Sequence, residues 1–289
     1  MKRFLCAFLL LLTLTGSSFS AERKLLRLGL LSKLNSTEEK FSEAWKQTFA
    51  PHNEILEVRI KFYDSLTAMQ LALEAGDIMQ MVLPHASAEY VLSQNQNYES
   101  ILVLHADNMG LAFGFREDSK DLRDKFNEAL RHMRINWILQ TLEGIYTASV
   151  GISGEPEPVD FEKFKDADTI RVAVTGDLPP IDYIAADGTP MGFNTAVLSE
   201  IGSYLKKNIE LVEVDAGART AALASGRADV VFWYEVDTSA SVQNDVPEGV
   251  ILSEPYYTWN KFIHIRKRPN GNTSGNWSIK RDILRLYSW

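Results

Sequence analysis

The chain has 289 residues, with 38 acidic and 30 basic side chains and a formal net charge of −8. A protein that binds nucleic acid through its phosphates needs a basic face, so this charge argues against a nucleic acid partner. The length allows one large domain or two smaller ones.

Residues 1–20 have the pattern of a secretory signal peptide. Lys2 and Arg3 precede an apolar run at residues 5–14, and small residues up to Ser20 form a cleavage site. The apolar run is too short to span a bilayer. Without Lys2 and Arg3, the 30 basic residues fall to 28 against 38 acidic ones, a net charge near −10. We therefore expect an exported, soluble mature protein.

The single cysteine, Cys6, lies inside the apolar run of this signal. The mature chain would then have neither a disulfide nor a cysteine nucleophile. Export without disulfides suits a bacterial periplasm.

The next part of the chain alternates between strand and helix patterns. Apolar runs predict strands at residues 27–31, 55–63 and 78–83. Helical spacing predicts helices at residues 39–49 and 66–75, the second of which ends at Gly76.

Two places near the ends of these strands could face a ligand. Ser36 and Thr37 precede the helix at 39–49, and free backbone N–H groups at a helix start favour an anionic group. An ordinary helix cap is the alternative. His85 follows the strand end at Pro84 and is expected near the same edge of the sheet.

The middle of the chain contains a strand or crossover at residues 101–104, a strand at 109–116 and a helix at 119–131. Glycine and proline at residues 151–158 then predict a linker.

A second run of alternating elements occupies residues 169–237. Strands are predicted at 170–174, 210–214 and 229–233, with helices at 194–205 and 219–224. This order implies a parallel sheet with right-handed crossovers. Ligands bind beyond the carboxyl ends of such strands, which places the loops 177–183 and 234–238 at one mouth.

The two runs repeat one plan, strand-helix-strand-helix-strand. RLGLL and AMQLALEAGDIMQMVL in the first run match RVAVT and RTAALASGRADVVFW in the second, in kind and order. We therefore expect two similar lobes. A duplication without a cleft would give the same pattern, so the repeat alone does not establish a ligand site.

The second run resembles the first lobe of periplasmic solute-binding proteins that serve polar amino acid ABC transporters. The ordered strand, Pro-Pro loop, Asp-Gly turn, Gly-Phe, helix and A-L-x-S-G-R-x-D series carries this resemblance. The block GLAFGFREDSKDLRDKFNEALRHMR resembles the segment that ends such proteins. Asn136-Trp137 stands where the family usually has glycine.

The resemblance implies an α/β fold with two similar lobes, each a mainly parallel sheet flanked by helices, and a ligand cleft between them (periplasmic-binding-protein-like II). The segments come in an unusual order, which suggests a circular permutant; permutation is tolerable where chain ends lie at the surface. The expected division is a signal peptide at 1–20, a second-lobe-like part at 21–105, a first-lobe-like part at 106–266 (terminal-type segment 106–150, linker 151–167, core 168–266) and an unassigned tail at 267–289.

The family's charged contacts to an amino acid are largely replaced in this chain. Thr238 matches a family threonine, but Ser241 stands where the family has the arginine that pairs with the ligand carboxylate. Met79 and Pro84 stand at or near the family's aspartate positions. The loss of such partners weakens binding by a few kcal/mol. We therefore expect a solute other than a simple zwitterionic amino acid.

The candidate ligand-binding residues lie on the predicted mouth loops and helix starts. They are Asp177, Asp182, Tyr183, Trp233, Tyr234, Asp237, Thr238, Ser36, Thr37 and His85. An aromatic solute could be held by Tyr183, Trp233, Tyr234 and Tyr257, although Trp233 could instead belong to the core.

Neither a catalytic constellation nor a metal-ligand spacing is found among the five histidines or elsewhere in the sequence. We expect no cofactor, no metal and no catalysis. The expected function is capture of a small solute by hinge closure, as a monomer that serves an ABC permease or a membrane sensor. The alternatives are a protein-interaction or sensory module and an exported dehydratase-like enzyme, which would need a cleft carboxylate with a raised pKa.

Overall fold

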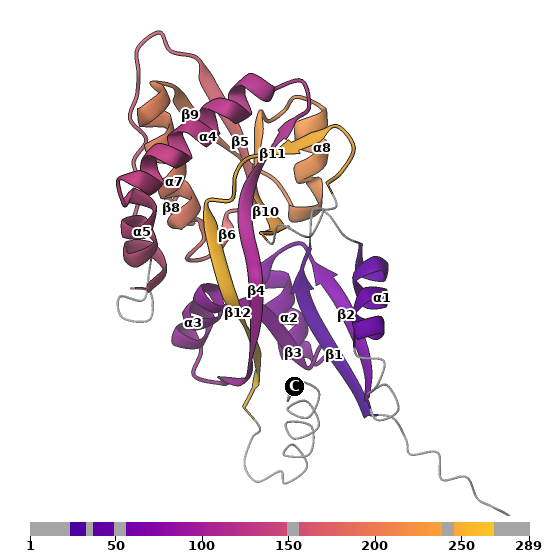
Figure 1. The fold of residues 1–289 in the computed structure, drawn as a ribbon. Coiled ribbons are helices and arrows are strands. Elements are labelled where there is room, and N and C mark those ends of the chain that lie inside the picture. The colour runs from indigo at the N-terminus through magenta and orange to yellow at the C-terminus, as the bar shows by residue number, and fades with distance from the viewer. Residues whose placement is uncertain (1–23, 33–36, 49–55, 149–155, 239–245, 269–289) are drawn as a thin grey trace, which may run out of the picture.

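A computed structural model of the chain describes residues 24–32, 37–48, 56–148, 156–238 and 246–268. These residues form two lobes, one above the other in Figure 1, which are joined by two long strands. The predicted signal peptide and tail lie outside the described residues, except for residues 267 and 268.

The N-terminal lobe contains three parallel strands and three helices. In chain order they are β1 (Lys24–Leu31), α1 (Glu38–Thr48), β2 (Leu56–Tyr63), α2 (Leu66–Ala75), β3 (Gln80–Pro84) and α3 (His85–Gln94). β1 lies between β2 and β3 and pairs in parallel with both. The strands and helices predicted in this part of the sequence are confirmed, with small shifts of their ends.

Local sequence explains the bounds of α2. The Ser65 side chain accepts a hydrogen bond from the backbone N–H of Ala68 at 3.0 Å, which caps the first turn. Gly76 ends the helix in the left-handed region, with φ of 80°.

Two antiparallel strands run from one lobe to the other. They are β4 (Tyr98–Arg116) and β12 (Tyr257–Lys267), paired from Tyr257 opposite Leu111 to Lys267 opposite Tyr98. The prediction of separate elements at 101–104 and 109–116 is wrong, because β4 is one strand of 19 residues. β4 pairs with β12 on both sides of the segment between those ranges, at His105 and at Met109, and an irregularity in the pairing lies between these two positions.

The central lobe contains the remaining elements. In chain order they are α4 (Lys120–Ile135), α5 (Ile138–Glu143), the π-helical turn η2 (Gly144–Ala148), β5 (Thr169–Val174), β6 (Asp177–Leu178), β7 (Asp182–Ile184), β8 (Pro190–Met191), α7 (Phe193–Leu205), β9 (Asn208–Glu213), the 3-10 turn η3 (Ala216–Ala218), α8 (Arg219–Ala224), β10 (Val230–Asp237) and β11 (Val250–Leu252).

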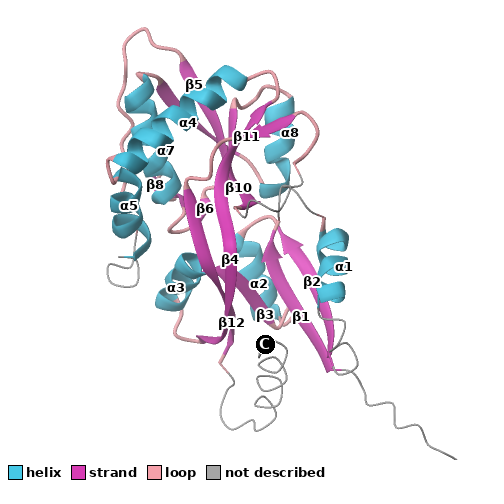
Figure 2. Cartoon of the chain, in the orientation of Figure 1, coloured by secondary structure: helices cyan, strands magenta, loops and turns pink. Residues whose placement is uncertain are grey.

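The repeat predicted from the sequence is confirmed in space. β5 lies between β9 and β10 and pairs in parallel with both, as β1 does with β2 and β3. The whole sheet has the order β2-β1-β3-β12-β4-β10-β5-β9, with β11 on β4, while β6-β7-β8 form a small separate sheet. Helices pack around this sheet in both lobes (Figure 2).

The predicted end of the last strand at residue 233 is wrong. β10 continues to Asp237 because its second half pairs antiparallel with β4, after an irregularity between Val231 and Tyr234. The predicted loop at 234–238 is therefore mostly strand.

The predicted segment boundaries and the circular permutation stay predictions. The boundary at 105 falls inside β4, and the boundary at 266 falls near the end of β12. Part of the predicted linker, at 151–155, lies outside the described residues.

One apolar core connects the lobes. A single buried cluster includes Met69 and Leu83 of the N-terminal lobe and Phe126 and Phe232 of the central lobe. Phe113 of β4 lies in the same cluster, with its ring 5.3 Å from that of Phe126. None of the helices in the described residues is long and apolar enough to cross a membrane.

We predict that Gly192→Ala lowers stability more than Gly188→Ala. Both glycines have positive φ, at 95° and 87°. A Cβ at Gly192 would lie 2.7 Å from the carbonyl oxygen of Pro180, whereas a Cβ at Gly188 meets nothing within 4 Å. We expect the Gly192 variant to lose about 2–3 kcal/mol and the Gly188 variant about 1 kcal/mol in urea unfolding. Equal losses would contradict this reading of the turn before α7.

Candidate functional site

A space of about 560 Å³ lies between the lobes. Its lining comes from the turn before α2 and the start of α2 in the N-terminal lobe, and from the ends of β5 and β9 and their following turns in the central lobe. The lining residues are Asp64, Ser65, Thr67, Thr175, Asp177, Glu213, Val214, Asp215, Ala218 and Arg227. Because β5 and β9 are parallel, this space lies at the carboxyl ends of strands, where ligands of α/β sheets bind.

The side chain of Asp177 reaches across this space from the central lobe to the N-terminal lobe. It lies at the start of β6 in the central lobe, and its Oδ2 accepts a hydrogen bond of 2.7 Å from the backbone N–H of Leu66, the first residue of α2. The N–H groups of a first helical turn have no partner within the helix, so the carboxylate supplies one from the other lobe. Burial raises the pKa of Asp177 to about 6, and the bond from Leu66 opposes that rise.

Asp182 supports the turn that carries Asp177. It is buried on β7, and its Oδ2 accepts hydrogen bonds of 2.9 Å from both the backbone N–H and the Oγ1 of Thr175. Burial raises the pKa of Asp182, against these two bonds. The Asp182 side chain thereby ties β7 to the end of β5.

Arg219 is a fully buried guanidinium behind the space. It donates hydrogen bonds to the carbonyl oxygens of Ala216 at 2.9 Å, Phe232 at 3.2 Å and, across the lobes, Ser32 at 3.3 Å. Burial lowers the pKa of Arg219 to about 10, while the nearby carboxylate of Asp182 opposes the shift. The arginine therefore stays charged at neutral pH and holds the end of β1 against the central lobe.

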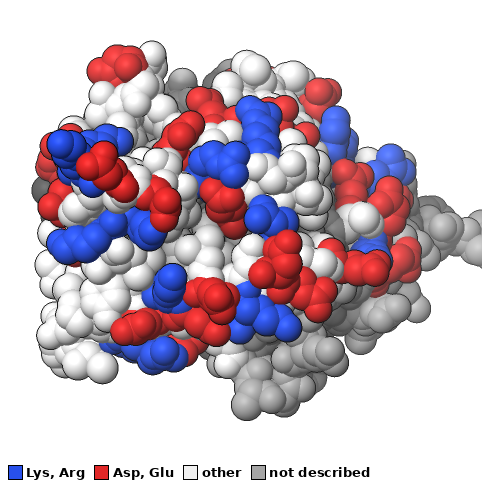
Figure 3. Space-filling view, turned by 90° about the horizontal axis from the view of Figure 1, so that it is seen from above, with Lys and Arg blue, Asp and Glu red and all other residues white. Residues whose placement is uncertain are grey.

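The lining is richer in carboxylates than in cations. Asp64, Asp177, Glu213 and Asp215 stand against Arg227 among the described lining residues. On the face of the molecule seen from above, acidic and basic side chains are instead interspersed (Figure 3). A solute in the space would thus meet an acidic surface.

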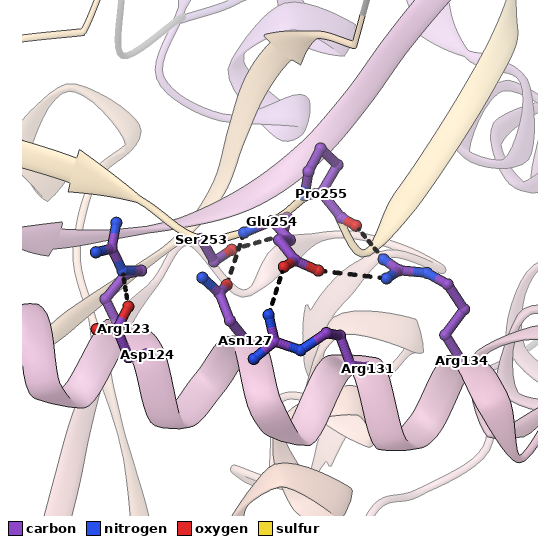
Figure 4. A network of polar contacts seen from close by, with 8 residues as sticks. All are labelled: Arg123, Asp124, Asn127, Arg131, Arg134, Ser253, Glu254 and Pro255. Carbon is purple, nitrogen blue, oxygen red and sulfur yellow. Dashed lines mark hydrogen bonds and ion pairs between the residues drawn. The ribbon is translucent and has the colours of Figure 1, made fainter.

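The start of β12 is anchored to α4 (Figure 4). Glu254 accepts from Arg131 at 2.8 Å and from Arg134 at 3.4 Å, and its backbone N–H donates to Asn127 Oδ1 at 2.7 Å. Arg134 also donates to the carbonyl oxygen of Pro255 at 2.8 Å. These contacts fix, in the central lobe, the place from which a lobe-crossing strand departs.

Three predicted site residues lie on the β6-β7 turn. Asp177 is the one predicted residue among the described lining of the space. Asp182 is buried behind it, and Tyr183 is half-buried on β7, opposite Asp177 in the small sheet.

The predicted residues of the N-terminal lobe lie at helix starts. Thr37 precedes α1, and its Oγ1 accepts a hydrogen bond from the backbone N–H of Lys40 at 3.3 Å, as in an ordinary helix cap. Ser36 lies outside the described residues. His85 begins α3, is exposed, and has its Nε2 3.6 Å from Glu89.

The other four predicted residues lie between the middle of β10 and the residue directly after it. The backbone of Trp233, Tyr234 and Asp237 belongs to this strand, and their side chains lie outside what the structure describes. Thr238 is exposed just after the strand. Ser241, at the family's arginine position, lies in the undescribed stretch 239–245.

Asp64, Asp215 and Arg219 belong to the site and were not predicted from the sequence. Asp64 directly follows β2, and its Oδ1 accepts from the Ser32 hydroxyl at 2.7 Å, which ties together two strand ends. One feature of the sequence could have indicated Arg219. It is the one charged residue of the short helix α8, which otherwise contains small and apolar residues. Among the described residues, no group of three His, Cys, Asp or Glu side chains is placed to hold a metal.

We predict that Arg219→Met lowers the free energy of unfolding by roughly 3 kcal/mol. The change leaves three carbonyl oxygens and the buried Asp182 without the guanidinium. Arg227→Met is the control, because Arg227 is exposed and lines the same space; we expect its effect within about 0.5 kcal/mol. A loss below about 1 kcal/mol for the Arg219 variant would contradict the structural role given to it.

Residues 170–274 match the family "Bacterial extracellular solute-binding proteins, family 3". No curated protein sequence matches the chain.

Several solved structures are similar to the chain at low sequence identity. A pheromone cOB1 precursor/lipoprotein of the YaeC family from Enterococcus faecalis is 14% identical, with a TM-score of 0.47 and coverage of 92% of each chain. The methionine-binding protein MetQ is 10% identical, with a TM-score of 0.44 and coverage of 91% of this chain and 89% of MetQ. The aliphatic sulphonate binding protein SsuA from Escherichia coli is 11% identical, with a TM-score of 0.42 and coverage of 91% and 71%. Similarities at this level transfer no ligand to the present chain.

The matched segment 170–274 contains β5, the small sheet, α7, β9, α8 and β10, together with β11 and β12. It therefore supplies the central-lobe side of the space between the lobes. This segment, about a third of the chain, is similar to the bacterial extracellular solute-binding proteins, family 3.

Proposed function

We propose that the protein captures a small polar or aromatic solute between its lobes, by hinge closure, for import by an ABC permease or for sensing. The observation that carries this proposal is the space of about 560 Å³ whose lining comes from both lobes. A solute that contacts both linings favours the closed arrangement, and such closure is a general mechanism of periplasmic binding proteins.

The crossing strands support hinge motion. Two strands, β4 and β12, pass between the lobes, and β12 has irregular pairing with β4 between Trp259 and Lys261. Such irregularities are places where a strand can bend. The lobes would then move as bodies about this short segment.

The charge of the lining supports a solute that is not a simple zwitterion. A ligand carboxylate would meet several carboxylates and, among the described lining residues, Arg227 as its cation. Carboxylates near one another repel, so an amine-bearing, neutral polar or aromatic solute fits this lining better than an amino acid bound through its carboxylate.

The place of action follows from the predicted signal peptide. We propose that residues 1–20 direct export to the periplasm and that the mature chain works there as a monomer, without a nucleic acid partner, cofactor or turnover of its solute. The permease or sensor would contact the closed form.

Two other functions each have one supporting observation. The apolar cluster shared by both lobes favours a protein-interaction or sensory module, because packed lobes leave less room for a solute. The raised pKa of Asp177, near 6, meets one requirement of a dehydratase-like enzyme. The Asp177 carboxylate is bound to the Leu66 N–H, however, which makes it a poor free base.

A thermal-shift screen tests solute capture. The mature chain from residue 21 would be screened against amines, organic acids, amino acids, small peptides and aromatic solutes. A solute at one hundred times its Kd should add about 2.7 kcal/mol of stability, which is several degrees in Tm for a protein of this size. A solute that is chemically changed after incubation, as judged by mass spectrometry, would support the enzyme instead.

A matched pair of variants places the solute between the lobes. Thr67→Trp fills the space from α2, and we expect it to abolish the shift. Leu71→Trp, on the same helix, replaces a side chain that is 65% exposed and should leave the shift unchanged. A shift that persists in the Thr67 variant would contradict binding at this site, and no shift with any solute would favour the interaction module.

A further inference from the structure

Asp177 is bound to the opposite lobe through its side chain alone. Its backbone belongs to β6, which pairs with β7 inside the central lobe. Its Oδ2 accepts from Leu66 N in the N-terminal lobe at 2.7 Å, although the two residues are 111 positions apart. Any opening of the lobes at this point must break that bond and free the first turn of α2.

Burial makes the position of Asp177 unfavourable for a negative charge, and the carboxylate of Asp182 adds to this effect. Two ionisable groups interact with its charge, Asp182 of β7 and Arg219 of α8. The other ionisable groups that line the same space are Asp64, Glu213, Asp215 and Arg227. The two cations differ in their surroundings, because Arg219 is buried on backbone carbonyls whereas Arg227 is exposed.

We propose that Asp177 is an interlobe latch that closes the two lobes by capping α2 across the cleft and takes up a proton as it does so. The carboxyl oxygen accepts the Leu66 N–H in either protonation state, so protonation keeps the bond and removes the buried charge. This adds regulation to the proposed function, yet it concerns closure alone and can be tested with no solute present.

The direction of the pH effect follows from the two states of Asp177. In the latched state its pKa is about 6, and in an open, solvated state it returns toward the ordinary value of 3.8. The latched form therefore holds more protons than the open form between these values, and acid favours closure. With these two values, lowering the pH from 7.5 to 5 should raise the ratio of closed to open protein about tenfold.

The test measures lobe closure in the mature protein without solute. The mature chain has no cysteine of its own if the segment with Cys6 is removed, so Leu71→Cys and Ile135→Cys give one dye site in each lobe. Energy transfer between the dyes and small-angle X-ray scattering then report closure. We expect the parent protein to become more compact between pH 7.5 and pH 5.

Three variants separate the latch from general charge effects. Asp177→Asn keeps an acceptor for Leu66 and has no charge, so it should be closed at both pH values. Asp177→Ala lacks the acceptor and should be more open at both. Asp215→Asn removes a charge from the same space without a bond to α2 and should keep the pH response of the parent.

The outcomes that overturn the latch are distinct from a failure of solute capture. An Asp177→Ala protein with the parent's compactness at both pH values would show that the bond to Leu66 does not hold the lobes. A parent protein that opens as the pH falls would show that closure releases a proton. In either case a thermal shift with a solute would still support the proposed function.

Discussion

The pairing of β4 with β12 is the constraint on which the rest of the structure depends. These strands pair along almost all of β12, and they are the two middle strands of the sheet, with three strands of the N-terminal lobe on one side and the central-lobe strands on the other. Neither lobe's sheet is complete without them. Relative motion of the lobes must therefore bend or twist this pair, and the anchor of Glu254 on α4 sets the end from which β12 moves.

In addition to the crossing strands, side-chain hydrogen bonds at strand ends connect the two lobes. Asp177 reaches α2, and Arg219 reaches the carbonyl oxygen of Ser32 beyond β1. Asp177 and Arg219 both belong to the segment matched by the solute-binding family. Their partners, the Leu66 N–H and the Ser32 carbonyl oxygen, belong to the first repeat. Closure and the candidate site thus share the same small group of residues.

The repeated strand-helix pattern predicted much of this fold because it depends on local periodicity and on caps such as Gly76. The length of β4 could not be predicted in this way, since its two halves are joined by a polar segment and both halves pair with β12, about 150 residues later in the sequence. The extension of β10 to Asp237 has the same cause. Long-range pairing leaves little local trace in the sequence.

The site was predictable only in part, for a related reason. Asp177 could be found because it follows a strand end before two prolines, which is a local signal. The burial of Arg219 and the bond of Asp177 to Leu66 depend on how the lobes meet, and no periodicity in either segment encodes that contact. Ser36, a predicted site residue, and Ser241, at the family's arginine position, lie outside the described residues.

A crystal structure of the mature chain with the solute selected by thermal shift tests the central claim most directly. We expect electron density for the solute between the turn at Asp64–Thr67 and the segment Glu213–Ala218, with contacts to both lobes. Density elsewhere, such as on the outer side of β9, or a solute in contact with one lobe alone would contradict capture by closure of the two lobes.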